Sequence, residues 1–94
     1  MLGGLSSLKE VDNEIIDIVN SLKNNFEEKN YKTELFEAIS YKSQIVNGTN
    51  FFIKVQTDKE IIHLKVYKKI KQLEPLNIND LQNDKSKDDE INYF

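Results

Sequence analysis

The chain contains no cysteine among its 94 residues. It can therefore form neither a disulfide framework nor a metal site built from thiolates. A domain of this size without disulfides must be held together by packing alone, which is typical of proteins that work in a reducing compartment. The sequence thus favours the cytosol.

The chain also has little of what directs proteins to membranes. Its first residues, Met1 to Ser7, have no basic region and no sustained apolar run, so they do not form a secretory signal. No stretch approaches the roughly twenty apolar residues that a membrane-spanning helix needs. Leu2 stands where a myristoylation signal has glycine. We expect a cytoplasmic protein with no membrane partner.

Neither sign of charge is in large excess, because 13 basic residues stand against 16 acidic ones and the formal net charge is −3. Nucleic acid is therefore not an expected partner, since it favours a clustered basic face. The one basic cluster is interpreted as an exposed strand edge that tunes which proteins bind. It comprises Lys65, Lys68, Lys69 and Lys71.

His63 is the only histidine and falls on the polar side of a predicted strand. No cysteine or serine partners surround it, so we interpret it as a solvated side chain rather than a catalytic or metal-binding one. No nucleophile–base pair or ligand cluster is visible elsewhere. We expect no enzymatic activity, no catalytic residue, no metal site and no cofactor.

Apolar residues after residue 10 recur at spacings of three and four, which predicts an amphipathic helix over residues 12–30. The apolar stripe comprises Val11, Ile15, Ile18, Val19, Leu22 and Phe26. Two starts fit, because Ser7 with Glu10 matches a capping box, whereas Asp12 is a good N-cap for a later start. We favour Asp12, which leaves residues 1–10 extended.

After residue 35 the pattern changes to alternation, which predicts strands with one buried face. The predicted strands cover residues 35–46, 49–57 and 61–70, with a weaker one at Leu76, Ile78 and Leu81. In the first strand, the side shared by Glu37, Ile39, Tyr41, Ser43 and Ile45 opposes the other residues. Residues 84–90 mix both signs of charge and are interpreted as a solvated connection.

Short joints between the strands imply antiparallel neighbours. Asn47-Gly48 predicts a tight hairpin turn of a kind that needs positive φ at both positions. With 38% hydrophobic residues, the chain can form one domain over residues 1–94, in which residues 35–94 are a meander and C-terminal segment. The predicted fold is α+β, with a single long helix wrapped by a curled antiparallel sheet.

Residues 40–55, Ser-Tyr-Lys-Ser-Gln-Ile-Val-Asn-Gly-Thr-Asn-Phe-Phe-Ile-Lys-Val, resemble the stefins, which are the type 1 cystatins. The stefin signature Gln-x-Val-x-Gly matches Gln44, Val46 and Gly48. The likeness continues in Gly3-Gly4-Leu5-Ser6, in residues 27–29 and 63–67, and in the C-terminal residues 84–94. It therefore extends over nearly the whole chain, and a cystatin-like fold is what it implies.

The resemblance implies a tight, reversible, competitive inhibitor of papain-like cysteine proteases of the cathepsin type. In that family an N-terminal trunk and two hairpin loops form a wedge that fills the active-site cleft. The protease-binding residues carried over are Gly3, Gly4, Gln44, Ile45, Val46, Asn47, Gly48, Ile70 and Lys71. Gly3 is the better match for the key trunk glycine, Gln44 is expected to hydrogen-bond across the turn or stabilise the loop, and Ile45 and Val46 to supply apolar contacts.

The second loop departs from the family, because Ile70-Lys71 stand where stefins usually carry Leu-Pro. More of the binding is therefore expected from residues 44–48 and from the trunk. The alternative is a non-inhibitory interaction module that uses the sheet edge or the basic cluster. We also expect a monomer when active and a domain-swapped dimer if the hairpin opens at residues 44–49.

Overall fold

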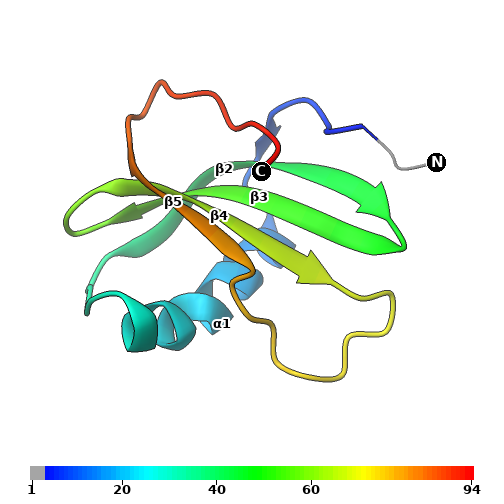
Figure 1. Cartoon of the computed structure of the whole chain (residues 1–94), viewed down its shortest axis with the longest axis horizontal. Coiled ribbons are helices and arrows are strands. Elements are labelled where there is room, and N and C mark those ends of the chain that lie inside the picture. The colour runs from blue at the N-terminus through cyan, green and yellow to red at the C-terminus, as the bar shows by residue number, and fades with distance from the viewer. Residues whose placement is uncertain (1–3) are drawn as a thin grey trace.

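The computed structural model describes residues 4–94, so the predicted trunk residue Gly3 lies outside the described residues. One helix packs on a five-stranded antiparallel sheet whose strands are ordered β1-β2-β3-β4-β5 (Figure 1). The elements are β1 (Lys9–Glu10), α1 (Asn13–Lys29), β2 (Phe36–Val46), β3 (Gly48–Thr57), β4 (Ile61–Lys68) and β5 (Asp80–Lys85). The predicted α+β fold is confirmed. No helix within residues 4–94 is long and apolar enough to cross a membrane.

Helix α1 begins where the later of the two predicted starts placed it. The Asp12 side chain accepts a hydrogen bond of 3.0 Å from the Ile15 backbone N–H and one of 2.8 Å from the Tyr41 hydroxyl. These bonds favour the charged carboxylate and hold the pKa of Asp12 below its usual value. The same cap therefore starts the helix and fastens it to β2.

The core lies between α1 and the face of the sheet that the helix covers. The helix contributes the predicted stripe, in which Ile15, Leu22 and Phe26 have no exposed surface. The sheet contributes alternate residues of its central strands, namely Phe51, Ile53, Val55, Ile62, Leu64 and Val66. Packing of a helical stripe on a period-two face gives the two-layer arrangement expected from the sequence.

Strand β2 does not alternate as predicted. A register shift between Ala38 and Ser40 inserts one extra residue opposite β3. Because such a bulge reverses which side chains face the core, Phe36 and Ala38 before it and Tyr41 after it all pack on the same cluster. The predicted side shared by Glu37, Ile39 and Tyr41 is therefore wrong.

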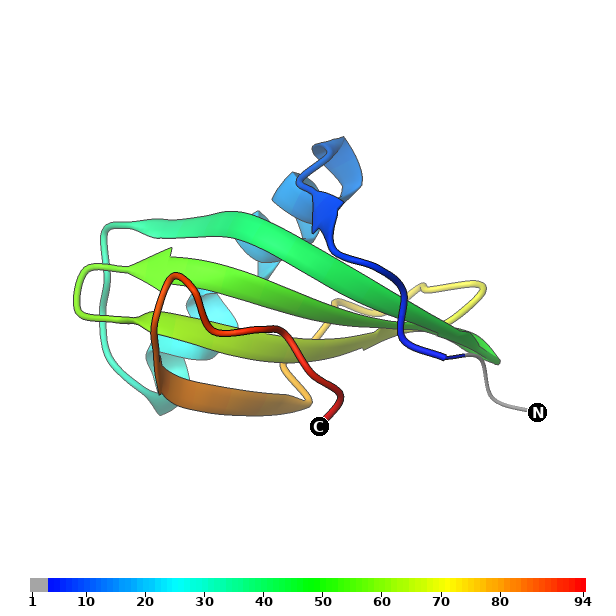
Figure 2. The ribbon, with the colours of Figure 1, turned by 90° about the horizontal axis from the view of Figure 1, so that it is seen from above.

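The second face of the sheet is also covered, contrary to the predicted single buried face. Figures 1 and 2 show the segment after β5 crossing the sheet on the side opposite α1. Ile91 of this segment is buried. The backbone carbonyls of Lys87 and Asp89, also in this segment, accept hydrogen bonds of 2.7 and 2.6 Å from the Lys54 ammonium group. Residues 84–90 are therefore more than a solvated connection.

The interpretation of His63 as a solvated side chain is wrong. The side chain of His63 has no exposed surface, and neither ring nitrogen has a hydrogen-bond partner within residues 4–94. Burial first, and then the positive charges of Lys54 and Lys85, lower its pKa to about 4, while Asp89 opposes the shift. His63 is covered by the C-terminal segment, which lies far from it in the sequence. The alternation pattern within one strand does not reveal such a contact.

The last strand is displaced from its predicted position. The weak strand predicted at Leu76 to Leu81 is instead β5, which begins at Asp80 and ends at Lys85. Leu76 and Ile78 pack against the core from an irregular connection, and the Ile78 N–H donates to the Asn25 side chain over 3.0 Å. A side-chain acceptor on α1 thus replaces a strand partner there.

Burial of neutral His63 predicts that stability falls on acidification. Between pH 6.5 and about 4 the unfolded chain binds a proton at this residue and the folded chain does not, so the free energy of unfolding decreases as pH falls. The shift corresponds to a loss of about 3 kcal/mol, at roughly 1.4 kcal/mol per pKa unit. Urea unfolding at pH 7 and pH 4 measures it.

The variant His63→Gln, which cannot titrate, isolates this contribution from that of the carboxylates. Its stability should fall less between the two pH values than that of the wild-type protein. An equal fall in both proteins would contradict the assignment.

Candidate functional site

Three segments meet at one end of the sheet (Figures 1 and 2). They are the β2–β3 turn, the start of the connection after β4, and the N-terminal residues that run along β2. We call this end the loop edge and define it by residues 4–6, 44–49 and 68–71. The meander places the first two together, because β3 joins the turn to the strand that leads into the second connection.

The first loop is a tighter turn than predicted. Val46 pairs directly with Gly48, so that Asn47 alone forms the apex. Gly48 has a φ of 111°, whereas Asp84 is the only residue other than glycine with positive φ within residues 4–94. The hairpin is confirmed, but positive φ at both turn positions is wrong. The turn's conformational demand is concentrated on Gly48.

Gly48 is buried against the end of β4, which is a second reason for glycine at this position. A Cβ atom there would lie 2.6 Å from the Lys68 carbonyl oxygen and 2.6 Å from the Tyr67 hydroxyl. Backbone at that distance cannot yield without moving the strand. Glycine therefore permits close packing within the chain itself, a contact that the sequence did not predict.

The side chains of the first loop divide into exposed and supporting ones. Ile45 is 66% exposed, Asn47 is exposed, and Val46 is half-buried. Gln44 is buried and accepts a hydrogen bond of 3.0 Å from the Asn50 side chain across the β2–β3 pair. The bond across the turn that was expected of Gln44 is thus present, and the apolar surface at the tip comes from Ile45 and Val46.

The second loop turns at Ile70-Lys71, directly after β4. Ile70 is 78% exposed and lies with Ile45 and Val46 around one hollow, whose lining also includes Phe51 and the charged residues Lys68 and Lys69. Leu73 is 90% exposed in the same connection and was not among the predicted residues. Its only sequence signal is an isolated leucine between polar residues. The two loops thus present one shared apolar surface.

Charges at the loop edge are partly paired. The Lys68 ammonium group lies 3.0 Å from the Glu14 carboxylate, and that of Lys69 lies 3.6 Å from Glu74. All four groups are substantially exposed to water, so these pairs contribute little to stability. They reduce the net positive charge that the basic cluster would otherwise bring to the loops.

The N-terminal segment is fastened to β2 by Ser6. The Ser6 N–H donates to the Ser43 carbonyl over 2.8 Å, and the Ser43 N–H donates to the Ser6 hydroxyl over 2.9 Å. Gly4, which follows the undescribed residues, is exposed, and no atom lies within 4 Å of where its Cβ would be. The serine pair therefore directs the trunk along β2 toward the first loop.

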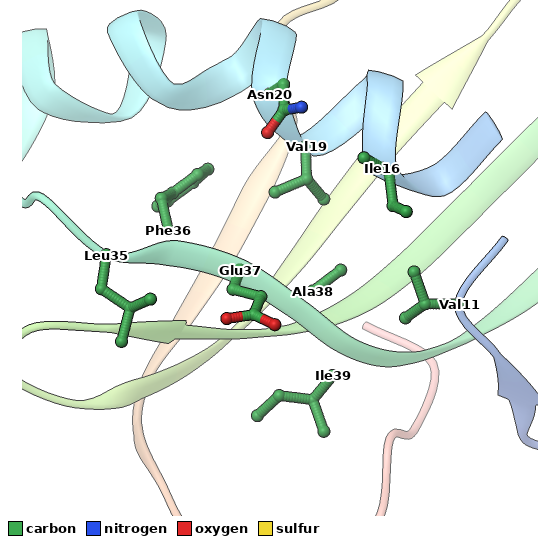
Figure 3. A pocket seen from close by; sticks show the side chains of 9 residues that line it. All are labelled: Val11, Ile16, Val19, Asn20, Leu35, Phe36, Glu37, Ala38 and Ile39. Atoms are coloured by element: carbon green, nitrogen blue, oxygen red, sulfur yellow. The ribbon is translucent and has the colours of Figure 1, made fainter. Parts of the chain in front are cut away.

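A second hollow lies at the other end of β2, between that strand and α1 (Figure 3). Its lining includes Val11, Ile16 and Leu35, of which Ile16 is 44% and Leu35 40% exposed. None of the predicted site residues within residues 4–94 takes part in it. Within residues 4–94, moreover, no three histidine, cysteine or acidic side chains gather as a metal site would require.

Comparison with known proteins identifies the family. The family model described as "Cystatin domain" matches residues 3–92. The chain belongs to the cystatin family. It is 45% identical to cystatin-A of Homo sapiens, covering 98% of this chain and 97% of the relative. It is also 41% identical to cystatin-B of Macaca fuscata fuscata and 40% identical to cystatin-A2 of Dictyostelium discoideum, with at least 97% of each chain covered.

These relatives confirm the stefin resemblance, since cystatins A and B are of the stefin type. Cystatins are inhibitors of cysteine proteases, and this chain is accordingly an inhibitor rather than an enzyme. The exposed apolar side chains that the two loops share suit such a role.

The packing of Gly48 predicts a large difference between two glycine substitutions. Gly48→Ala should lower the free energy of unfolding by about 1–3 kcal/mol, because it combines a strained φ with a backbone clash. Gly4→Ala is the matched control and should change stability by less than about 0.5 kcal/mol, since the added methyl meets nothing. Urea unfolding of both variants measures the difference, and equal effects would contradict it.

Proposed function

We propose that the protein is a reversible, tight-binding, competitive inhibitor of papain-like cysteine proteases of the cathepsin type. It blocks the active-site cleft with the loop edge, and Gly3 and Gly4 of the trunk occupy the substrate side. The first loop, Gln44–Gly48, enters the centre of the cleft, and Ile70-Lys71 contact its other side. No bond is made or broken, because binding alone excludes the substrate.

The observation that carries this proposal is the apolar surface that two loops share. Ile45 and Ile70 are both mainly exposed at one end of the sheet, on turns whose ends are held by paired strands. Large exposed apolar side chains on a fixed frame favour binding, since little conformational entropy is lost on docking. An interface of this class typically buries on the order of 1,600 Å² in total.

The trunk supports the proposal in a different way. Among its described residues, it is hydrogen-bonded to β2 at Ser6 and paired with β2 at the two residues of β1, whereas Gly4 has no atom within 4 Å of its Cβ position. A glycine with free space around its Cβ position allows backbone to lie close to a partner surface. The absence of cysteine agrees with action in the cytosol, which we include in the proposal.

Replacing Ile45 tests the proposal at the centre of the loop edge. The variant Ile45→Asp places a charge on a mainly exposed position, so it should leave folding nearly intact and raise the inhibition constant for papain at least about tenfold. The constant is measured from papain activity over a range of inhibitor concentrations.

Ile16→Asp is the matched control, because Ile16 is also a partly exposed isoleucine but lines the hollow at the other end of β2. Its inhibition constant should equal that of the wild-type protein. Full papain activity in the presence of micromolar wild-type protein would reject the proposal. Stronger impairment of papain inhibition by Ile16→Asp than by Ile45→Asp would instead favour an inhibitory contact at the hollow between α1 and β2.

The active form is proposed to be the monomer. Opening of the hairpin at residues 44–49 would join β2 and β3 into one long strand and allow exchange with a second copy. Such a dimer has no first-loop turn and should inhibit papain poorly. Gel filtration after partial unfolding, with a papain assay on each peak, measures this, and a dimer as inhibitory as the monomer would contradict it.

A further inference from the structure

Tyr67 connects the end of strand β4 to the apex of the first loop. Its hydroxyl donates a hydrogen bond to the backbone carbonyl of Asn47. Its ring edge and hydroxyl also fill the space where a side chain of residue 48 would begin. Tyr67 therefore contacts both residues on which the tight turn depends, although it lies 20 positions later in the chain.

The backbone of Tyr67 is held by Asn79, at the far end of the second connection. Its N–H donates to the Asn79 side chain over 2.7 Å, and the Asn79 N–H donates to the Lys65 carbonyl over 2.8 Å. Asn79 directly precedes β5 and closes the connection that carries Ile70 and Leu73. Tyr67 thus stands where the base of the second connection and the tip of the first loop meet.

Because of this position, Tyr67 has a different role from Tyr41, which is a core tyrosine. Tyr41 packs in the core and holds the cap of α1, so its loss would affect the whole fold. Tyr67 lies outside the core cluster, and its hydroxyl bonds an exposed carbonyl that water could satisfy instead. Removing that hydroxyl should therefore cost little global stability, but it releases the apex of the loop.

We propose that Tyr67 is a positioning residue of the inhibitory surface, which holds the apex at Asn47 and Gly48 in the conformation that docks. The inference rests on the proposed function and goes beyond it, because Tyr67 acts through the first loop and not by touching the protease. Its effect is preorganisation, since a loop already held in place loses less freedom on binding.

The test is the variant Tyr67→Phe, which removes only the hydroxyl. Its inhibition constant for papain should rise about three- to tenfold, the usual range for one hydrogen bond, mainly through faster dissociation. Its melting temperature should stay within about 2 °C of the wild-type value. In the free protein, amide hydrogen exchange measured by NMR should accelerate at residues 47–49 and remain unchanged in α1. A residue with a merely structural role would shift all three together.

Tyr93→Phe is the matched control, because Tyr93 is a mainly exposed tyrosine of the C-terminal segment, and its ring packs on Phe52. It should change none of these measurements.

Two results would overturn the inference. One is unchanged exchange at residues 47–49 in Tyr67→Phe, which would mean that the hydroxyl does not hold the loop. The other is an inhibition constant of Tyr67→Phe equal to that of the wild-type protein, which would mean that the hydroxyl has no effect on docking. Hydrogen exchange in the free protein does not depend on any protease. Failure of the proposed function would be seen as full papain activity with the wild-type protein. The two failures can therefore be distinguished.

Discussion

The packing of α1 on one face of the sheet is the constraint on which the rest of the structure depends. With no disulfide, the helical stripe and the facing side chains of β3 and β4 supply the core. Strands β2 and β3 are paired over a long distance, from Phe36 with Thr57 to Val46 with Gly48. The core packs against the middle of this pair. The turns can therefore extend beyond the core and still be fixed by the strands that enter it.

The C-terminal segment adds a second buried layer. Lys54 has little exposed surface, yet its ammonium group is held by two backbone carbonyls of that segment. The ring of Phe52 packs against those of Tyr93 and Phe94, at centroid distances of 5.7 and 5.6 Å. A domain of 94 residues thus buries both faces of its central strands, which offsets the small size of its core.

The sequence predicted those features that depend on neighbouring residues. The period of the helix, its Asp12 cap and the hairpin around Gly48 are local patterns, and all three are present. The burial of His63 could not be predicted, because it depends on a segment more than twenty residues later that crosses the sheet. The bulge in β2 was missed for a related reason, since the apolar Ile39 at the extra position makes the residues on either side of it read as one continuous alternation.

The candidate site divides in the same way. Gln44, Val46 and Gly48 were identified through the family signature, whereas Ser6, Tyr67 and Leu73 were not, because their roles come from contacts or exposure that only the fold creates. The supporting residues show why the loop edge is well formed. Ser6 directs the trunk along β2, and Tyr67 ties the first loop to the strand that leads into the second.

The most direct measurement is a map of the interface with catalytically inactivated papain, made by NMR on isotope-labelled protein. The account predicts that resonances of Gly4, Ile45, Asn47 and Ile70 change or broaden at one equivalent of papain, while those of α1 at Ile16 and Asn20 stay in place. Changes centred on the hollow between α1 and β2, with the loop edge unaffected, would contradict the account.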